Sequence, residues 1–347
     1  MSSPTPKVIR LLHLFKTLEH TKYPPSKFLP NLINFETLTG IRKFSFRVIN
    51  FMLKCIQILN LNILFILMLH KIFNYIFLKL ISFYKKLLKI RRFRKVEFDY
   101  FSKKYRLYNK NYFFILFGKD KFVSRNTFVN GPHDSYFLDS SINLTKKQIH
   151  YLIDVGANIG TFCIPGVLNN KIKECIAIEP VNRINKILKI NISLNDLENK
   201  IKVFDYVISD KSKQKLNLIE NKFNYGDNRF QITQKKQKIF NSRKLDTFIN
   251  YFDTKKLIIK IDVQGFEDRV LIGSQKFIKK KVPLIIEFNS SFKRSKYFQK
   301  IINLLEDNYS SFFYLENISS KFNDIKILKN KLNNLNKSNT EINCLIL

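Results

Sequence analysis

The fold is decided by the stretch Ile153–Phe162, which reads IDVGANIGTF. An apolar strand that ends at Val155 is followed by a glycine-rich turn, and a helix begins near Gly160. Gly156 permits a tight turn, and Gly160 lets the backbone come close to a ligand at the helix N-terminus. Nineteen residues beyond Gly160, Glu179 ends a second apolar strand. An acid at that distance is placed to accept hydrogen bonds from both ribose hydroxyls of a nucleoside cofactor.

The spacing of the glycines distinguishes two classes of nucleoside cofactor. The dinucleotide fingerprint G-x-G-x-x-G requires glycine at positions 158 and 161, where this chain has Asn158 and Thr161. The chain instead has G-x-N-x-G from position 156 to position 160, preceded by Asp154. Because a turn of this kind need not lie against a pyrophosphate, the spacing favours S-adenosylmethionine over NAD.

Strands and helices alternate from residue 149 to residue 347. Strands are expected near 150–155, 174–178, 201–208, 256–262, 283–288, 311–315 and 341–347, and helices near 160–168, 181–195, 265–280 and 294–307. Alternation of this kind predicts an α/β fold, with a mostly parallel sheet and helices on both of its faces. The unbroken apolar runs Leu257–Ile259 and Leu284–Ile286 predict central strands that are buried on both faces.

Four motifs of this region together resemble those of the FkbM-type methyltransferase family: Asp154–Gly160, Ile178–Pro180, Lys260–Glu267 and Ile286–Glu287. The resemblance covers roughly residues 120–347 and is carried by the order and spacing of the motifs. It implies a Rossmann-like class I methyltransferase fold with a mostly parallel seven-stranded sheet. It also implies S-adenosyl-L-methionine as the cofactor, and a family activity that is mostly O-methylation of sugars and natural products.

The resemblance further implies which residues bind the cofactor. The glycine-rich turn would line the methionine and ribose, Glu179 would hold the ribose, and Ser209, at the end of the third strand, would border the adenine. The full expected set is Asp154, Gly156, Ala157, Asn158, Gly160, Glu179, Pro180, Ser209 and Asp262. No cluster of Cys and His has the spacing of a zinc site, and no metal is expected.

The expected reaction is direct, in-line transfer of a methyl group to a hydroxyl of a small molecule or glycan, with Asp262 and Glu287 as candidates for the base. Asp262 could instead cap the helix that begins near Gly265. Glu267 lies in the first turn of that helix, where the helix dipole favours an acid whatever its function. Family members usually have Glu at the position of Gln264, and glutamine can neither accept a proton nor supply a carboxylate to a metal.

The segment Asn224–Arg229 is expected in an insertion between the third and fourth strands. We interpret it either as a lid whose Arg229 meets a polar or anionic acceptor, or as a plain surface turn. The sequence alone leaves both interpretations open.

The N-terminal third differs from the rest of the chain in charge. The whole chain has 61 Lys and Arg against 27 Asp and Glu, a net charge of +34. Residues 1–110 hold 22 Lys and Arg and four acids, a net +18, and no acid lies between Glu36 and Glu97. From Phe46 to Lys95 the chain has neither Pro nor Gly, and its polar residues recur every three or four positions. This pattern predicts a long amphipathic helix.

Three interpretations of that helix stay open. It could lie in a membrane interface, with the cations of residues 85–95 on anionic headgroups. It could pack on the protein or on a second subunit. It could also span a bilayer, although the uncharged run Cys55–Leu69 has 15 residues against the roughly 20 that a span needs.

These patterns predict three domains: a basic amphipathic extension at 1–95, a β-rich lead-in at 96–148 with a turn at Gly118–Asp120, and a methyltransferase domain at 149–347. The rival hypothesis for the whole chain is a degenerate, methyltransferase-like binding or scaffold protein at a membrane surface. A nucleic-acid partner is not favoured, because Leu87, Leu88 and Ile90 within the basic run suit an apolar surface better than bases. The four cysteines form no CxxC pair, which fits a cytoplasmic protein, either free or on the cytoplasmic face of a membrane.

Overall fold

The computed structural model describes residues 63–94, 100–107, 110–132, 135–221, 223–232, 239–315, 322–335 and 341–347. The chain divides into two compact units, Met1–Ser82 and Phe83–Leu347. Helix α3 (Ile63–Arg94) confirms a long helix over that part of the predicted range 46–95, and residues 46–62 of the prediction lie outside the described residues. The domain boundaries near residues 95 and 148 stay predictions.

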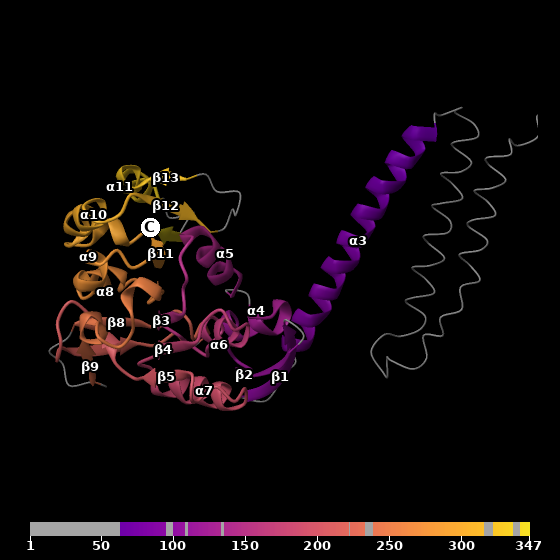
Figure 1. The fold of residues 1–347 in the computed structure, drawn as a ribbon. Helices are drawn as coiled ribbons and strands as arrows, with labels where there is room; N and C mark the ends of the chain where they lie inside the picture. The colour runs from indigo at the N-terminus through magenta and orange to yellow at the C-terminus, as the bar shows by residue number, and fades with distance from the viewer. Residues whose placement is uncertain are drawn as a thin grey trace, which may run out of the picture. The chain divides into compact units, whose positions relative to one another are not determined.

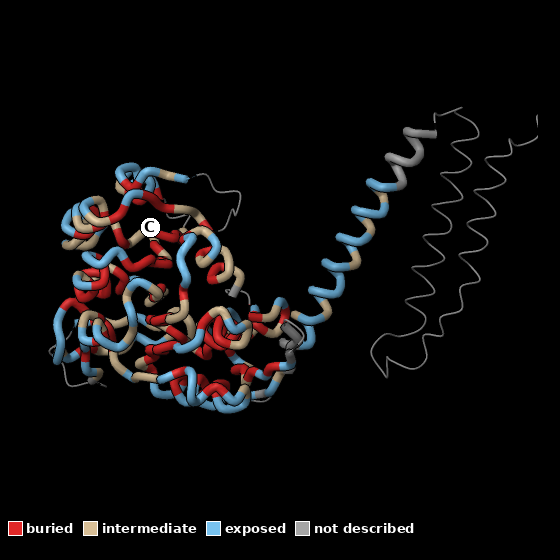
Figure 2. The backbone as a smooth tube through the Cα atoms, viewed as in Figure 1, coloured by how far each residue is buried: buried red, intermediate tan, exposed pale blue. Residues whose placement is uncertain are grey.

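Helix α3 exposes large apolar side chains along the part of its length where burial is described (Figure 2). These side chains are Ile72, Tyr75, Ile76, Leu78, Leu80, Phe83, Tyr84 and Leu87. The basic side chains of the same helix are exposed as well, namely Lys71, Lys79, Lys85, Lys86, Lys89, Arg91 and Arg92. Among the described residues, no helix combines the length and the apolar character needed to cross a membrane.

The second unit is built on a sheet of eight strands in the order β13-β12-β14-β11-β10-β3-β4-β5 (Figure 1). The strands are β3 Tyr151–Val155, β4 Glu174–Ile178, β5 Ile201–Phe204, β10 Leu257–Ile261, β11 Leu284–Asn289, β12 Ser311–Tyr314, β13 Asn323–Asp324 and β14 Glu341–Ile346. Neighbouring strands from β11 to β5 are parallel, whereas β14 runs antiparallel to both β11 and β12. The sheet is thus mostly parallel, with β14 reversed between β11 and β12 and β13 antiparallel to β12 at the edge. The predicted fold is therefore confirmed, with β13 added at the edge.

The order of the strands defines where a ligand binds. The chain builds β3, β4 and β5 outward to one side, and then crosses to build β10 and β11 on the other side of β3. In sheets of this kind, ligands bind outside the carboxyl ends of the strands at the point where the order reverses. That point lies here between β3 and β10, whose register pairs Asp154 with Lys260.

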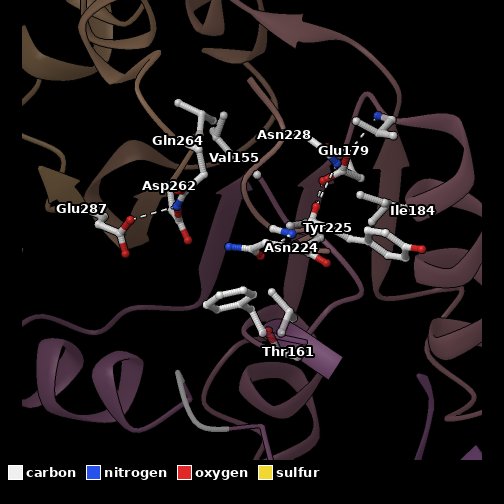
Figure 3. Close-up of a pocket in the computed structure, with 18 of the residues that line it drawn as sticks. Val155, Thr161, Glu179, Ile184, Asn224, Tyr225, Asn228, Asp262, Gln264 and Glu287 are labelled. Atoms are coloured by element: carbon white, nitrogen blue, oxygen red, sulfur yellow. Dashed lines mark hydrogen bonds between the residues drawn. The ribbon is translucent and has the colours of Figure 1, made fainter. Parts of the chain in front are cut away.

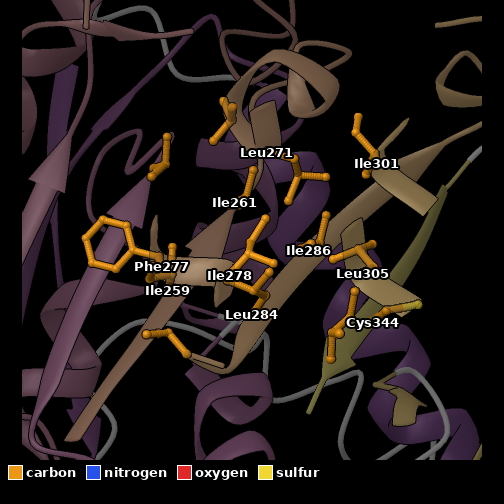
Figure 4. Close-up of a cluster of buried hydrophobic side chains, with 14 of the residues drawn as sticks. Ile259, Ile261, Leu271, Phe277, Ile278, Leu284, Ile286, Ile301, Leu305 and Cys344 are labelled. Carbon is orange, nitrogen blue, oxygen red and sulfur yellow. The ribbon is translucent and has the colours of Figure 1, made fainter. Parts of the chain in front are cut away.

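Successive side chains along each strand point to opposite sides of the sheet, which gives it two apolar faces. On one face, Ile259 and Ile261 belong to a core that includes helices α8 to α11 (Figure 4). On the other face, Ile258 belongs to a core that includes α5, α6 and α7. The helices are α5 Ser135–Thr145, α6 Cys163–Leu168, α7 Asn182–Ser193, α8 Glu267–Ile272, α9 Gln275–Lys279, α10 Phe298–Glu306 and α11 Leu328–Asn333. The central strands are thus buried on both faces as predicted, and the single helix predicted over 265–280 is divided into α8 and α9.

The lead-in is a hairpin followed by two helices. Strands β1 (Tyr100–Leu107) and β2 (Lys110–Phe117) pair antiparallel, so the lead-in contains β structure as expected. The turn at Gly118–Asp120 does not join these strands, because it leads from β2 into helix α4 (Val123–Asn130). The carboxylate of Asp120 accepts hydrogen bonds from the backbone N–H of Phe122 (3.1 Å) and of Ser124 (2.7 Å), and these bonds satisfy donors at the start of that helix. The expectation of a β-rich segment did not include the helices α4 and α5.

A second sheet of four strands, in the order β6-β9-β7-β8, is inserted between β5 and β10. Its strands are β6 Val207–Ile208, β7 Lys215–Ile219, β8 Arg229–Ile232 and β9 Ile239–Arg243. The strand predicted over 201–208 is wrong in its second half, because β5 ends at Phe204 and β6 pairs with β9 instead of with the central sheet. The sequence predicted an insertion here but not a sheet, since these strands are short and rich in polar residues.

Candidate active site

A cavity of about 670 Å³ lies at the carboxyl ends of β3, β4, β10 and β11 (Figure 3). Its wall is completed by α4 and by residues of the insertion, among them Asn224, Tyr225, Gly226 and Asn228. Sites for small molecules and cofactors have volumes of this order. The crevice at which the strand order reverses is therefore open to a ligand.

The glycine-rich turn is held between two strands of the sheet. The backbone N–H groups of Gly156 and Ala157 both donate to the carbonyl oxygen of Ile178, at 3.0 and 3.1 Å. Gly156 has φ of +85°, and a Cβ on it would lie 1.9 Å from the backbone oxygen of Asp262. Only glycine fits this position, because both the backbone conformation and the close approach exclude a side chain.

Glu179 lies at the end of β4 with its carboxyl group on the cavity wall. Its Oε2 accepts a hydrogen bond from the backbone N–H of Asn158 (3.1 Å), and its Oε1 accepts one from the N–H of Val181 (2.9 Å). Burial raises the pKa of this carboxyl to about 7. Each oxygen keeps capacity for a further hydrogen bond, which is what a vicinal diol requires.

An apolar wall borders the same cavity. It is formed by Val155, Ile178, Val181, Ile184, Tyr206, Val207, Ile208, Phe230, Val263 and Phe266. Tyr206 to Ile208 follow β5, and Phe230 comes from β8 of the inserted sheet. A wall of this composition suits a flat aromatic ring such as a purine.

The polar end of the cavity is a chain of contacts across β10 and β11. The Nζ of Lys260 donates to Oδ2 of Asp262 (3.1 Å), and Nε2 of Gln264 donates to Oδ1 of Asp262 and to Oε1 of Glu287, at 2.9 Å each (Figure 3). Burial, with a further contribution from Asp262, raises the pKa of Glu287 to about 9. The strands thus bring together both residues that the sequence proposed as bases, with Gln264 between them. Glu341 on β14 also lines this cavity.

Glu267 has a different role from these residues. Its carboxyl group is buried and accepts hydrogen bonds from the backbone N–H of Gly265 (2.9 and 3.0 Å) and of Val263 (3.2 Å). Burial raises its pKa to about 7. Glu267 therefore holds the loop that carries Gln264, whose φ of +53° is unusual for a residue other than glycine.

Part of the chain is similar to a known family. Residues 154–312, somewhat less than half of the chain, match the family model described as the methyltransferase FkbM domain. The chain is therefore similar to methyltransferases of this family. It is a methyltransferase that uses S-adenosylmethionine, as the glycine-rich turn and Glu179 predicted. No curated protein matches the chain.

The chain is also similar to solved methyltransferase structures. TYW2 of M. jannaschii in complex with AdoMet is 12% identical, with 71% of this chain and 84% of that chain covered and a TM-score of 0.34. The complex of aTrm5 with tRNALeu is 12% identical, with 72% and 53% covered and a TM-score of 0.36. The fold is assigned from the strand order of the central sheet and from the family match.

Three of the expected cofactor residues do not line the cavity. Asp154 is fully buried, and neither of its oxygens has a hydrogen-bond partner among the described residues; the Nζ of Lys260 lies 3.6 Å from its Oδ1. Gly160 lies behind the cavity wall, where a Cβ would meet Ile164 and Leu188. The hydroxyl of Ser209 is within 2.9 Å of both Asp210 and Gln214. The other six, Gly156, Ala157, Asn158, Glu179, Pro180 and Asp262, line the cavity.

The structure adds residues that sequence patterns did not single out. Lys260 is 12% exposed and lies between Asp154 and Asp262. Its place in β10 was recognisable as a cation inside an apolar run, which usually requires an acidic partner. Arg125, Asn126 and Asn130 on α4 line the cavity as well, and they carried no signal because α4 itself was not predicted.

The insertion forms part of the cavity wall, but Arg229 does not. Its guanidinium is 60% exposed and pairs with Asp227 at 2.7 Å. Tyr225 is held from outside by Arg183, whose guanidinium lies 4.8 Å from the centre of the Tyr225 ring and 5.1 Å from that of Phe117. The insertion is thus fastened to the hairpin, and whether it moves as a lid stays a hypothesis.

Proposed function

We propose that this methyltransferase O-methylates a hydroxyl group of a sugar, a glycan or a related metabolite. The observation that carries the proposal is the polar end of the cavity, where Asp262, Gln264 and Glu287 lie in one connected chain. Carboxyl and amide groups both donate to and accept from hydroxyls, which suits an acceptor with several hydroxyls.

For the cofactor, we propose that the turn Gly156–Asn158, Glu179 and Pro180 hold S-adenosylmethionine. When bound, this cofactor supplies an activated methyl group. Glu179 would accept hydrogen bonds from the ribose hydroxyls, since each of its oxygens has one backbone donor and room for a second. The wall that includes Ile208 and Phe230 would border the adenine, in place of Ser209.

For the proton transfer, we propose Asp262 as the base. It lines the cavity, and its carboxyl oxygens receive hydrogen bonds from Lys260 and Gln264 that hold it in place. Glu287, with a pKa of about 9, carries its proton at neutral pH and therefore cannot act as the base there. Instead Glu287 would orient the molecule that is methylated. One of its oxygens accepts a hydrogen bond from Gln264, and its protonated carboxyl would donate a hydrogen bond to an oxygen of that molecule.

We also propose that the extension 46–95 attaches the protein to the cytoplasmic face of a membrane. Over its described part, α3 exposes Leu78, Leu80 and Leu87 together with Lys85 and Arg91. A helix that carries large apolar side chains among exposed cations is typical of interfacial helices, which bury one face at the headgroup boundary. A glycan at the membrane would then lie within reach of the enzyme.

The rival hypothesis, a degenerate domain that serves only as a scaffold, is tested by methyl transfer. With S-adenosylmethionine labelled on the methyl group and a panel of hexoses and oligosaccharides, we expect label on a hydroxyl oxygen. Asp262→Asn should reduce transfer by about a hundredfold or more while cofactor binding is retained. Asp253→Asn, the same change at an exposed helix cap, is the matched control. Cofactor binding without transfer to any hydroxyl would favour the scaffold, and full activity of Asp262→Asn would remove Asp262 as the base.

A further inference from the structure

The wall of the cavity contributed by α4 and by the last turns of α3 differs in charge from the end at Asp262. Lys86 and Ile90 of α3 line this wall together with Arg125, Asn126 and Asn130 of α4. The two helices are tied by a hydrogen bond from the Nζ of Lys89 to the backbone oxygen of Val129, at 3.1 Å. Lys86 and Arg125 therefore belong to one wall of one cavity.

Within the part of the chain that the structure describes, the cations of this wall have no acidic partner. Among the described residues, no carboxylate forms a salt bridge with Lys86 or with Arg125. Three further cations, Lys89, Arg92 and Lys103, lie near one another. Burial and the nearby charges of Lys89 and Arg92 lower the pKa of Lys103. Gathering like charges costs free energy, and a bound anion recovers it.

The spacing along α4 directs several of its polar groups to the cavity. Asn126 and Asn130 are four residues apart, as are Arg125 and Val129, and all four line the cavity. Arg125 is only partly exposed, and its guanidinium lies 5.8 Å from the centre of the Phe122 ring. A guanidinium restrained in this way, with a lysine nearby, matches the oxygens of a phosphate group, which it can bind through two parallel hydrogen bonds. The asparagine amides match the hydroxyls of an attached sugar.

We infer that the acceptor carries a phosphate group, and that Lys86 and Arg125 bind this phosphate while the hydroxyl to be methylated lies at Asp262. The inference rests on the proposed function and names the acceptor's class: a phosphorylated sugar, either free or linked through its phosphate to a lipid. The cavity is acidic where the proton is removed and basic where the acceptor is anchored. A neutral sugar would leave the cations of Lys86 and Arg125 without a partner.

Binding of a hexose 1-phosphate to the full chain, measured by calorimetry, tests the inference, with the unphosphorylated hexose as the reference ligand. The double variant Lys86→Gln/Arg125→Gln should lose about tenfold or more in affinity for the hexose 1-phosphate. Lys85→Gln/Arg91→Gln removes the same charge from positions of α3 that do not line the cavity, and it should change the affinity by less than about twofold. Equal loss in both double variants, or equal affinity of the wild type for the two sugars, would overturn the inference.

Two further measurements are needed. One distinguishes a sugar phosphate from a lipid headgroup as the ligand of these cations, and the other distinguishes failure of the phosphate site from failure of the proposed function. Vesicles of phosphatidylcholine with phosphatidylglycerol should bind both double variants to the same extent. If only Lys86→Gln/Arg125→Gln loses vesicle binding while hexose 1-phosphate binding is unchanged, these cations serve lipid headgroups and the inference is wrong. Affinity for S-adenosylmethionine, measured on every variant, should stay at the wild-type value. A wild type that binds the hexose 1-phosphate but not the cofactor would contradict the proposed function and leave the phosphate site standing.

Discussion

Gln264 donates a hydrogen bond from Nε2 to Oε1 of Glu287 over 2.9 Å, and the same nitrogen donates to Oδ1 of Asp262. The two protons of one amide therefore bridge the two carboxyl groups. Where family members usually have Glu at this position, the chain has a neutral bridging donor. Because an amide donates to both carboxyl groups, it adds no third negative charge beside Asp262 and Glu287.

Replacing the amide by a carboxylate tests this bridge. Gln264→Glu places a third acid between Asp262 and Glu287, and repulsion should lower kcat/KM by about tenfold or more. The swap Gln264→Glu/Glu287→Gln restores the original number of acids and amides but leaves two acids adjacent at positions 262 and 264, and should recover only part of the lost activity. Steady-state kinetics of the three enzymes decide the matter. Unchanged activity of Gln264→Glu would show that the bridge does not matter for the reaction.

The pH dependence of the reaction should report the proton on Glu287. Because the pKa of Glu287 is about 9, its neutral form is present below that pH and is lost as the pH rises through it. We expect kcat/KM to hold up to about pH 9 and then to fall. Glu287→Gln, which is neutral at every pH, should abolish this alkaline fall. A fall of the same size in Glu287→Gln would assign it to another group.

Gly156 should not tolerate a side chain. Gly156→Ala would place its Cβ 1.9 Å from the backbone oxygen of Asp262, at a φ of +85°. We expect a loss of about 1–3 kcal/mol in the free energy of unfolding from the backbone conformation alone, and a weakened cofactor affinity. Gly166→Ala in α6 is the control, because its Cβ would meet chiefly a methyl group of Leu138 that can move. Denaturant unfolding and calorimetry measure the two effects, and equal behaviour of the two variants would contradict the account.

Asp120 connects the lead-in to the insertion. It is 1% exposed, and besides holding the start of α4 it accepts a hydrogen bond from the backbone N–H of Tyr225, at 3.4 Å. Asp120→Ala leaves these donors without an acceptor, and should cost about 1–3 kcal/mol in the free energy of unfolding. It should also raise KM for the acceptor and for the cofactor, because α4 and Tyr225 both line the cavity. Asp139→Ala is the control. Asp139 pairs with Lys171 and its side chain is 23% exposed, against 1% for Asp120, and its loss should affect neither KM.

Much of the central sheet could be predicted from the sequence, because buried parallel strands are nearly continuous apolar runs. Leu257–Ile259 and Leu284–Ile286 lie in β10 and β11 as expected. The inserted sheet could not be predicted in this way, since strands such as Lys215–Ile219 are polar on an exposed face. Helix α4 was missed for a related reason. Its eight residues include Ser124, Asn126 and Thr127, which have low helix propensity. Burial of one side of α4 against the protein compensates for this.

The candidate site was predictable where backbone geometry requires a residue type. Gly156 and Glu179 are examples, because a tight turn and a strand-end acid leave a signature at fixed spacing. Ser209 does not line the cavity, because β6 pairs with β9 and leaves the central sheet instead of continuing the third strand to Ile208. Asp154 was assigned to the cavity by its position before the turn. Strand alternation instead turns it into the protein, towards Lys260.

Binding of S-adenosylmethionine to the wild type and to Glu179→Ala, measured by titration calorimetry at pH 8, tests the central claim most directly. At this pH the carboxyl of Glu179, with a pKa of about 7, is ionised and can accept hydrogen bonds from both ribose hydroxyls. We expect the wild type to bind, and Glu179→Ala to bind about tenfold to a hundredfold more weakly, because two charge-assisted hydrogen bonds are lost. A wild type that does not bind, or a Glu179→Ala variant that binds as tightly as the wild type, would contradict the assignment of this cavity to the cofactor.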